Sequence, residues 1–385
     1  MRNDVKTILF FSLEEGAMGG VASVNDTLKK ALEARGHRVL SLYLRAQRHE
    51  DGKMTIRQNR PWSLTRGCEI KKAIRQGKFF FALLLFLRRL LETAAYQKDL
   101  SRAKTIIAKA APDAIIPSHY LLLDGVPKGL LSRTLHHVHT SFDATMENPA
   151  TRKALMRYNG KIGFLWLSRG VCEKAEKAGL TPSFFLYNPL SHMPEERTEA
   201  ETQTTVSILT RFSPEKRLPL AVSLLQKALD SLPNPDAFSV KFYGEGPEED
   251  ALQKAVEGDG RFALMGRVPS PWEPLSQTRF TINTSLFEGF PMSVLEALGA
   301  GVPTVSFVFG EAAEELIRTE ETGILLDMDD HSGFVHSLTR LFTDPELVQK
   351  LSLNARAYAE RFQKETIAEE WETLLEKLPL DKIGK

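Results

Sequence analysis

The sequence predicts an α/β protein of two domains, each a doubly wound, Rossmann-like parallel sheet. Strand-like and helix-like stretches alternate along most of the chain, which is typical of parallel sheets because each crossover needs a helix. The 385 residues are long for one domain and sufficient for two. A polar stretch over 189–204 has two prolines and no hydrophobic periodicity. We therefore expect domains over 1–190 and 205–362 that face each other across a central cleft.

The first half begins with an apolar run over 7–13 that is typical of a buried parallel strand. A helix over 21–35, ended by Gly36, and a strand over 37–44 follow. Residues 45–100 show no clear pattern except for a basic helical segment within them. The later strands of this half are expected over 113–117, 134–139, 163–168 and 183–187.

The second half repeats the alternation. Its strands are expected over 205–210, 238–243, 261–265, 279–284, 303–307 and 323–326. Its helices are expected near 217–231, 248–257, 293–299, 311–318, 332–343 and 346–361. A last helix within 363–385 is a candidate to pack back on the first domain.

Composition indicates a cytoplasmic globular protein. Hydrophobic residues make up 42% of the chain and charged residues 26%. The two cysteines, Cys68 and Cys172, lack metal-ligand spacing and favour a reducing compartment. The N-terminal residues have no signal-peptide layout, and the longest apolar run, over 79–87, is too short to span a membrane.

Charge is distributed unevenly between the halves. Residues 1–190 hold 31 Lys and Arg against 16 Asp and Glu, whereas the remainder holds 19 against 33. A basic first half favours an anionic partner such as a phosphate-rich polymer or an acidic lipid surface. Residues 70–90 combine a basic start with a dense apolar run. They predict either a buried helix with a basic end or a helix at the inner face of the membrane.

Two glutamates mark the most informative segment. Glu288 and Glu296, separated by seven residues, follow a strand-like run and lie around the start of a helix. In an open α/β sheet ligands bind at strand ends, and a helix N-terminus attracts phosphate. Carboxylates there suit hydroxyl groups, so the pair favours a nucleotide-sugar. Alternatively, Ser293 and Glu296 form a capping box and Glu288 is a solvated loop acid.

Arg211 and Lys216 lie where another predicted strand ends and a helix begins, in the segment 209–217. A departing nucleoside diphosphate gains negative charge as the glycosidic bond breaks, and fixed cations stabilise that charge. A surface pair at a helix start is the alternative for these two residues.

These segments resemble family-4 retaining glycosyltransferases of the GT-B fold, most strongly over 205–327. The resemblance implies that Glu288 contacts the donor sugar, that Glu296 holds the ribose hydroxyls and that Arg211 and Lys216 neutralise the diphosphate. Thr210 replaces the glycine that the family usually has before the arginine. The resemblance also implies donor contacts from the intervening loop, which comprises Phe290, Pro291, Met292, Ser293 and Val294.

Other segments match the same family. Gly244 lies in a glycine turn, and Arg267 and Val268 lie in the segment whose backbone meets the nucleotide base. Gly19 and Gly20 match the glycine loop over the donor phosphates, and His139 matches a histidine near the reacting sugar. A packing role for Gly244, an ordinary tight turn at 19–20 and a hydrogen-bonded strand-end histidine are the alternatives.

No metal or other cofactor is expected. His137 and His139 share one face of a strand that His136 opposes, and no cysteine accompanies them. The D-x-D letters over 327–329 follow the last predicted strand and indicate a solvated loop.

The sequence therefore predicts a retaining, metal-independent transferase. It would move a hexose or HexNAc from a nucleotide-sugar, expected to be UDP-linked, to an acceptor of the cell envelope. Residues 187–190 and 306–310 weakly resemble bacterial enzymes that glycosylate teichoic-acid-type polymers. A capsule or lipid-linked glycan is a further acceptor class, and a nucleic-acid partner is not expected. The alternatives are a sugar-nucleotide epimerase and a non-catalytic, glycan-binding partner subunit.

Overall fold

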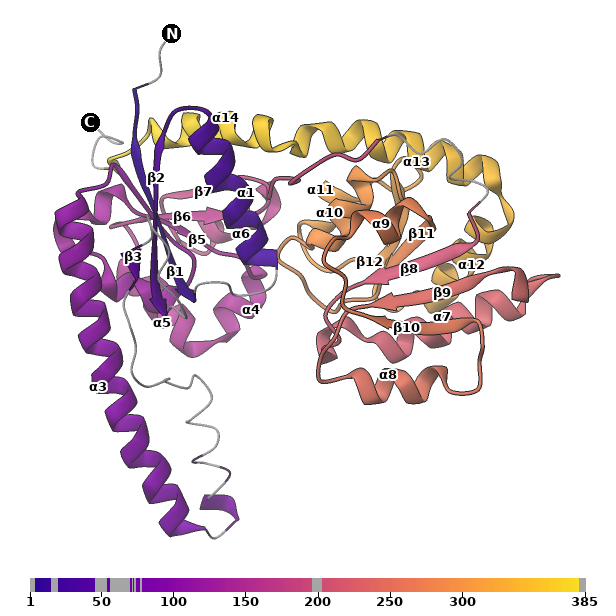
Figure 1. Ribbon diagram of the computed structural model, residues 1–385, viewed down its shortest axis with the longest axis horizontal. Helices are drawn as coiled ribbons and strands as arrows, with labels where there is room; N and C mark the ends of the chain where they lie inside the picture. The colour runs from indigo at the N-terminus through magenta and orange to yellow at the C-terminus, as the bar shows by residue number, and fades with distance from the viewer. Residues whose placement is uncertain are drawn as a thin grey trace.

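The computed structural model describes residues 4–14, 20–45, 54–55, 70, 72, 74–76, 78–195 and 203–380. It has two lobes built on twisted parallel sheets, with the C-terminal helices running along both (Figure 1). The predicted α/β class with Rossmann-like parallel sheets is confirmed. The predicted strands form with ends close to those expected, because their apolar runs are buried on both faces of the sheets.

The first lobe contains a sheet in the order β3-β2-β1-β4. A bridge between Ile115 and Thr134 places a second sheet, β5-β6-β7, beside it. The strand order changes direction between β1 and β4, and this switch point is where open α/β sheets bind ligands. The strands are β1 (Thr7–Glu14), β2 (Arg38–Arg45), β3 (Met54–Thr55), β4 (Ala114–Pro117), β5 (Leu135–His137), β6 (Gly163–Trp166) and β7 (Ser183–Phe185).

Alternate residues of β1 point to opposite faces of the sheet. Ile8 and Phe10 belong to the core that includes α1, whereas Leu9 and Phe11 belong to the core under α3. The α-helices of this lobe are α1 (Gly20–Ala34), α3 (Phe79–Ala110), α4 (Phe142–Glu147), α5 (Pro149–Tyr158) and α6 (Arg169–Lys177). The 3-10 helices are η1 (Tyr120–Gly125) and η2 (Lys128–Arg133).

Helix α3 is the main element that the sequence analysis did not resolve. Its C-terminal half packs under the first sheet through Leu100, Ala103 and Ile107. Its N-terminal half projects away from the lobe (Figure 1). The large apolar side chains between Phe79 and Leu91 are exposed there, so the interpretation of residues 70–90 as a buried helix is wrong. No helix within the described ranges is both long and apolar enough to cross a membrane.

The second lobe has one parallel sheet in the order β10-β9-β8-β11-β12-β13, with its switch point between β8 and β11. The strands are β8 (Thr205–Leu209), β9 (Ser239–Tyr243), β10 (Phe262–Gly266), β11 (Thr278–Asn283), β12 (Thr304–Phe307) and β13 (Gly323–Leu326). The helices are η4 (Pro214–Lys216), α7 (Leu218–Asp230), η5 (Pro235–Ala237), α8 (Glu249–Val256), α9 (Trp272–Ser276), α10 (Met292–Gly299), α11 (Ala313–Leu316), α12 (His331–Thr343) and α13 (Pro345–Ala359).

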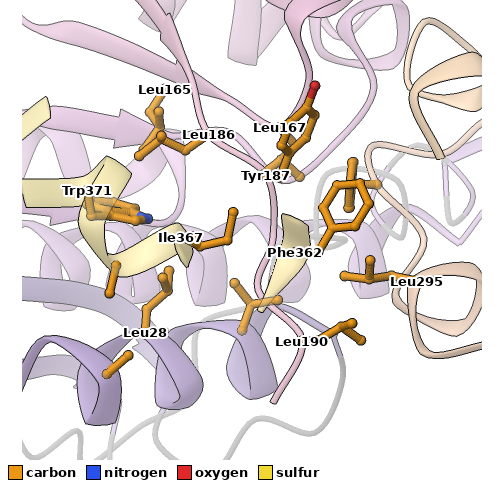
Figure 2. Packing of buried hydrophobic residues seen from close by; sticks show 14 of the residues in the cluster. Leu28, Leu165, Leu167, Leu186, Tyr187, Leu190, Leu295, Phe362, Ile367 and Trp371 are labelled. Atoms are coloured by element: carbon orange, nitrogen blue, oxygen red, sulfur yellow. The ribbon is translucent and has the colours of Figure 1, made fainter. Parts of the chain in front are cut away.

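The chain returns to the first lobe through η6 (Glu360–Phe362) and α14 (Lys364–Leu375). Trp371 is fully buried beside Phe10 of β1, with ring centroids 6.3 Å apart. Glu372 accepts a hydrogen bond from Arg35 at 2.7 Å and contacts the His37 ring nitrogen at 3.0 Å. One apolar cluster includes residues of both lobes and of α14, and so fixes how the lobes meet (Figure 2).

Candidate active site

A narrow pocket lies at the switch point of the second sheet. The carboxyl ends of β8 and β11 form its walls, together with Lys216 and the first turn of α10. It therefore combines the position and the helix N-terminus that suit a phosphorylated ligand. The residues that line it are Ile208, Leu209, Thr210, Lys216, Leu218, Leu275, Thr281, Ile282, Asn283, Thr284, Ser285, Ser293 and Val294.

Lys216 and Glu288 form an ion pair at this pocket, and each side chain is only 15% exposed. Two further bonds hold the loops that carry them, because Thr284 Oγ1 donates to the Lys216 carbonyl at 2.7 Å and the Leu286 amide donates to the Glu215 carbonyl at 2.8 Å. A cation and a carboxylate from separate motifs are thereby brought together. An anionic ligand group can take the place of the carboxylate at the Lys216 ammonium.

Arg211 lies near this pair but is oriented differently. Its side chain is 70% exposed and donates to Glu215 at 2.8 Å. Its backbone is held by the turn after β9, because the Phe212 amide donates to the Glu245 carbonyl at 2.9 Å. A Cβ atom on Gly244 would collide with the Thr210 carbonyl, so Gly244 supports the Arg211 loop by close packing. The Arg211 Nε also donates to Ser213 at 3.4 Å, and because the side chain is mostly exposed the guanidinium can turn toward a ligand.

Glu296 lies one helical turn after Ser293 on α10. Burial raises the pKa of its carboxyl to about 7. It makes no hydrogen bond or ion pair with any residue that the structure describes. The capping-box interpretation is wrong, because Pro291 is the N-cap of α10 and no side chain caps the helix. A half-buried carboxyl without a partner among the described residues can accept hydrogen bonds from the hydroxyl groups of a ligand.

The two lobes touch through backbone at the paired-glutamate loop. A Cβ atom on Gly289 would lie 2.5 Å from the His139 carbonyl oxygen. A Cβ atom on Gly20, the first residue of α1, would lie 3.2 Å from Met292 Cγ. The structure thus brings His139, Gly20 and the segment 288–292 together across the cleft. Gly19 lies outside the described residues.

His139 is a neutral, half-buried histidine. Its ring lies 4.0 Å from that of His137, as expected for residues on one strand face, whereas the His136 ring contacts the Pro117 carbonyl at 2.9 Å. Burial lowers the pKa of His139 to about 3. Its Nε2 atom is buried and has no hydrogen-bond partner within the described part of the chain. The neutral ring can therefore exchange a hydrogen bond with a substrate, but it does not supply a positive charge near pH 7.

Some residues that were predicted to bind the nucleotide-sugar donor can contact it only through their backbone atoms. Phe290 is buried in the core, where its ring lies 5.7 Å from that of Tyr187 and 6.0 Å from that of Phe362. Pro291 is also buried, whereas Ser293 and Val294 line the pocket. Arg267 and Val268 follow β10, and the Arg267 guanidinium pairs with exposed Glu245 at 3.7 Å.

Arg217 is a positioning residue that the sequence analysis did not single out. Its Nε donates to the Thr284 carbonyl at 2.6 Å, and its guanidinium lies 5.1 Å from the centre of the Phe307 ring. The Arg217 backbone has φ +51°, a value that residues other than glycine rarely adopt. It ties the end of β11 to the Lys216 turn. In the sequence, only its position directly after Lys216 indicated that Arg217 could belong to the site.

The D-x-D segment, 327–329, follows β13, and Asp330 caps α12 by accepting from the Gly333 amide at 2.8 Å. Among the described residues, no three His, Cys, Asp or Glu side chains form a cluster that could hold a metal ion.

A second pocket, of about 390 Å³, lies at the switch point of the first sheet. Lys29 projects into it from α1 and donates to the Tyr43 hydroxyl at 3.0 Å. Asn25 also lines it, and its Oδ1 is buried without a partner among the described residues. Ser118 and His119, after β4, complete a polar wall. Each lobe therefore has a pocket where its strand order reverses.

Residues 203–344 match the protein family described as Glycosyl transferases group 1. An uncharacterized glycosyltransferase of Haemophilus influenzae is 24% identical over 96% of this chain and 100% of its own length. An exopolysaccharide phosphotransferase of Streptomyces coelicolor is 29% identical over 46% of this chain and 19% of its own length. A poly(ribitol-phosphate) alpha-N-acetylglucosaminyltransferase of Staphylococcus aureus is 24% identical over 44% of this chain and 35% of its own length. The chain thus matches only a minor part of the last two relatives.

Solved structures resemble the whole chain. The crystal structure of TarM has a TM-score of 0.75 at 13% identity and covers 97% of this chain and 99% of that chain. Anabaena HepE in complex with UDP-glucose has a TM-score of 0.72 at 16% identity and covers 97% of this chain and 100% of that chain. Residues 203–344 are therefore similar to the group 1 glycosyl transferases, and the chain has the GT-B fold over almost its whole length.

Proposed function

We propose that this protein is a retaining, metal-independent hexosyltransferase of the family-4 type, which moves a hexose or HexNAc from a UDP-sugar to an acceptor of the bacterial cell envelope. The observation that carries the proposal is the ion pair between Lys216, which lines the switch-point pocket of the second lobe, and Glu288 of the loop before α10. The HepE complex with UDP-glucose, on the same fold, supports the choice of a UDP-sugar.

The donor would occupy the second lobe. Its diphosphate would lie against Lys216 and the N-terminal turn of α10, with Arg211 turning in from the exposed side. Glu288 would accept hydroxyl hydrogen bonds from the sugar, and Glu296 would accept those of the ribose. As the bond to the sugar breaks, the leaving diphosphate gains negative charge that Lys216 and Arg211 stabilise in place of a metal ion.

The acceptor would occupy the first lobe. The 390 Å³ pocket offers hydroxyl and amide groups from Ser118 and Asn25, together with Lys29 paired to Asp26 at 3.3 Å, and these groups suit the hydroxyls of a glycan or polyol. Its opening lies on the lobe whose residues 1–190 carry the excess of Lys and Arg. A teichoic-acid-type polymer, as named for the Staphylococcus aureus relative, fits this charge, and so does a capsule or lipid-linked glycan. The reaction would then take place on the cytoplasmic side of the membrane.

The chemistry requires the two lobes to come together. The backbone carbonyl of His139 lies against Gly289 of the donor loop, so this residue would lie near the sugar that is transferred. Retention of the anomeric configuration follows from the resemblance to the retaining family.

The test is a screen of UDP-, GDP- and ADP-sugars with polyol-phosphate and glycan acceptors, in chelator. We expect transfer from a UDP-sugar, with a first-formed product that keeps the donor's anomeric configuration by proton NMR. The matched control is the Glu288→Gln variant, which removes the negative charge of the carboxylate but keeps the shape of the side chain. Inversion of configuration, or a requirement for a divalent cation, would contradict the mechanism. Epimerised donor without any transfer would favour the epimerase alternative.

A further inference from the structure

The projecting end of α3 exposes an unusual amount of apolar surface. Nine large apolar side chains between Phe79 and Leu91 have exposed fractions of 48% to 75%. They cover the helix surface except for the side of Ala82 and Leu85, which are buried and contact Ile70. A soluble protein rarely exposes so large a continuous apolar surface unless something binds it. The nine residues are Phe79, Phe80, Phe81, Leu83, Leu84, Phe86, Leu87, Leu90 and Leu91.

The charge of this segment is of one sign. Residues 70–91 contain Lys71, Lys72, Arg75, Lys78, Arg88 and Arg89, and no Asp or Glu. The side chains of Lys78 and Arg89, which the structure describes, are exposed. A partner of the segment must therefore offer both an apolar interior and negative charge.

A second copy of the chain does not offer both an apolar interior and negative charge. Two copies packed through this segment would bring six cations against six, and like charges at close range are unfavourable. An anionic lipid bilayer meets both, because its acyl chains accept the apolar side chains and its phosphates accept the cations. The apolar stretch is about 20 Å long at 1.5 Å per residue, which is shorter than the hydrocarbon core of a membrane. The apolar stretch therefore suits insertion into the interfacial layer of a membrane and is too short to cross the membrane.

We propose that residues 78–91 bind the interfacial region of an anionic bilayer. The phenylalanine rings and leucine side chains lie between acyl chains at the level of the lipid headgroups, and Lys78 and Arg89 reach the lipid phosphates, whereas Arg88 donates to Glu92 at 3.1 Å. The projection of α3 keeps the lipid contact away from the two switch-point pockets (Figure 1).

The experiment measures binding of the full chain to vesicles by co-sedimentation, without donor or acceptor, so that its result is independent of the proposed activity. One set of vesicles is phosphatidylcholine alone, and the other contains phosphatidylglycerol as well. We expect binding to the anionic vesicles that weakens as salt rises. Each cation contributes about fivefold to the affinity, so Lys78→Gln with Arg89→Gln should weaken it about 25-fold.

The matched control is Arg152→Gln with Lys153→Gln, which removes two exposed charges from α5 of the same lobe. It should bind anionic vesicles almost normally. A second variant, Phe80→Ser with Leu84→Ser and Leu87→Ser, should lose vesicle binding while its melting temperature and its hydrolysis of donor stay unchanged, because these side chains are exposed in the protein alone.

Three outcomes would overturn the proposal. The first is equal affinity for neutral and anionic vesicles. The second is equal loss of binding in the α5 control. The third is a concentration-dependent dimer in solution that the serine variant abolishes, which would make a second copy of the chain the partner of α3.

Discussion

Glu296 is the residue whose proposed role can be tested most directly by pH. Burial raises the pKa of its carboxyl to about 7, above the value near 4.5 expected in the unfolded chain. If the ribose hydroxyls of the donor donate to the ionised carboxyl, donor binding must favour the ionised form. From pH 6 to pH 8 the ionised fraction rises from about one tenth to about nine tenths. The dissociation constant of UDP-glucose should therefore be about tenfold larger at pH 6 than at pH 8.

The assay is isothermal titration calorimetry with UDP-glucose, whose diphosphate stays fully ionised over this range. Repeating the titration at pH 7 in buffers of different ionisation enthalpy should show release of about half a proton on binding. His139 and His119 do not interfere, because burial lowers their pKa values to about 3 and about 4. Glu296→Gln should bind more weakly than the unchanged protein at pH 8 and show no pH dependence. The same pH dependence in Glu296→Gln would refute the reasoning.

Ionisation of Glu296 should strengthen donor binding as pH rises, but it should lower the free energy of unfolding over the same range. Because the folded pKa is raised, the folded chain binds more protons than the unfolded chain between pH 4.5 and about pH 7. The contribution of Glu296 to stability is present below pH 4.5 and is lost as pH rises through 7, by about 3 kcal/mol in total. Glu296→Gln should therefore gain stability relative to the unchanged protein as pH increases, measured by urea unfolding.

Lys216→Ala should lower kcat at least about 100-fold, and added Mg²⁺ should not restore it, because in the proposed donor complex the ammonium lining the pocket would face the leaving diphosphate; full rescue by Mg²⁺ would contradict this. Gly289→Ala should lower kcat about 100-fold, since its Cβ would meet His139 backbone at 2.5 Å and move the loops apart. Gly129→Ala, where nothing lies within 4 Å, is its control, and equal activities would refute the contact. Glu372→Ala should cost about 3 kcal/mol, because Arg35 and buried His37 lose their partner. Hydrogen exchange should rise first in α14, and a uniform rise over both lobes would contradict this docking role.

Sequence by itself determined the alternation of strands and helices, because buried parallel strands must be continuous apolar runs and crossovers must be helices. The runs over 7–13 and 279–284 and the helix start after Pro291 were readable in this way. The local order of Glu288, Glu296, Arg211 and Lys216 was readable for the same reason, since strand ends and helix starts define where a ligand binds.

Only the tertiary structure decided how these residues meet. The Lys216–Glu288 pair joins positions far apart in the chain, and the contact of Gly289 with His139 joins two lobes. Such contacts depend on the strand order and on how α14 ties the lobes together, which local pattern does not encode. The exposure of α3 could not be predicted from the sequence either, because an apolar run has the same pattern whether protein, lipid or water surrounds it. Burial also decided the pKa of Glu296, since a carboxyl has no shift until the fold removes its water.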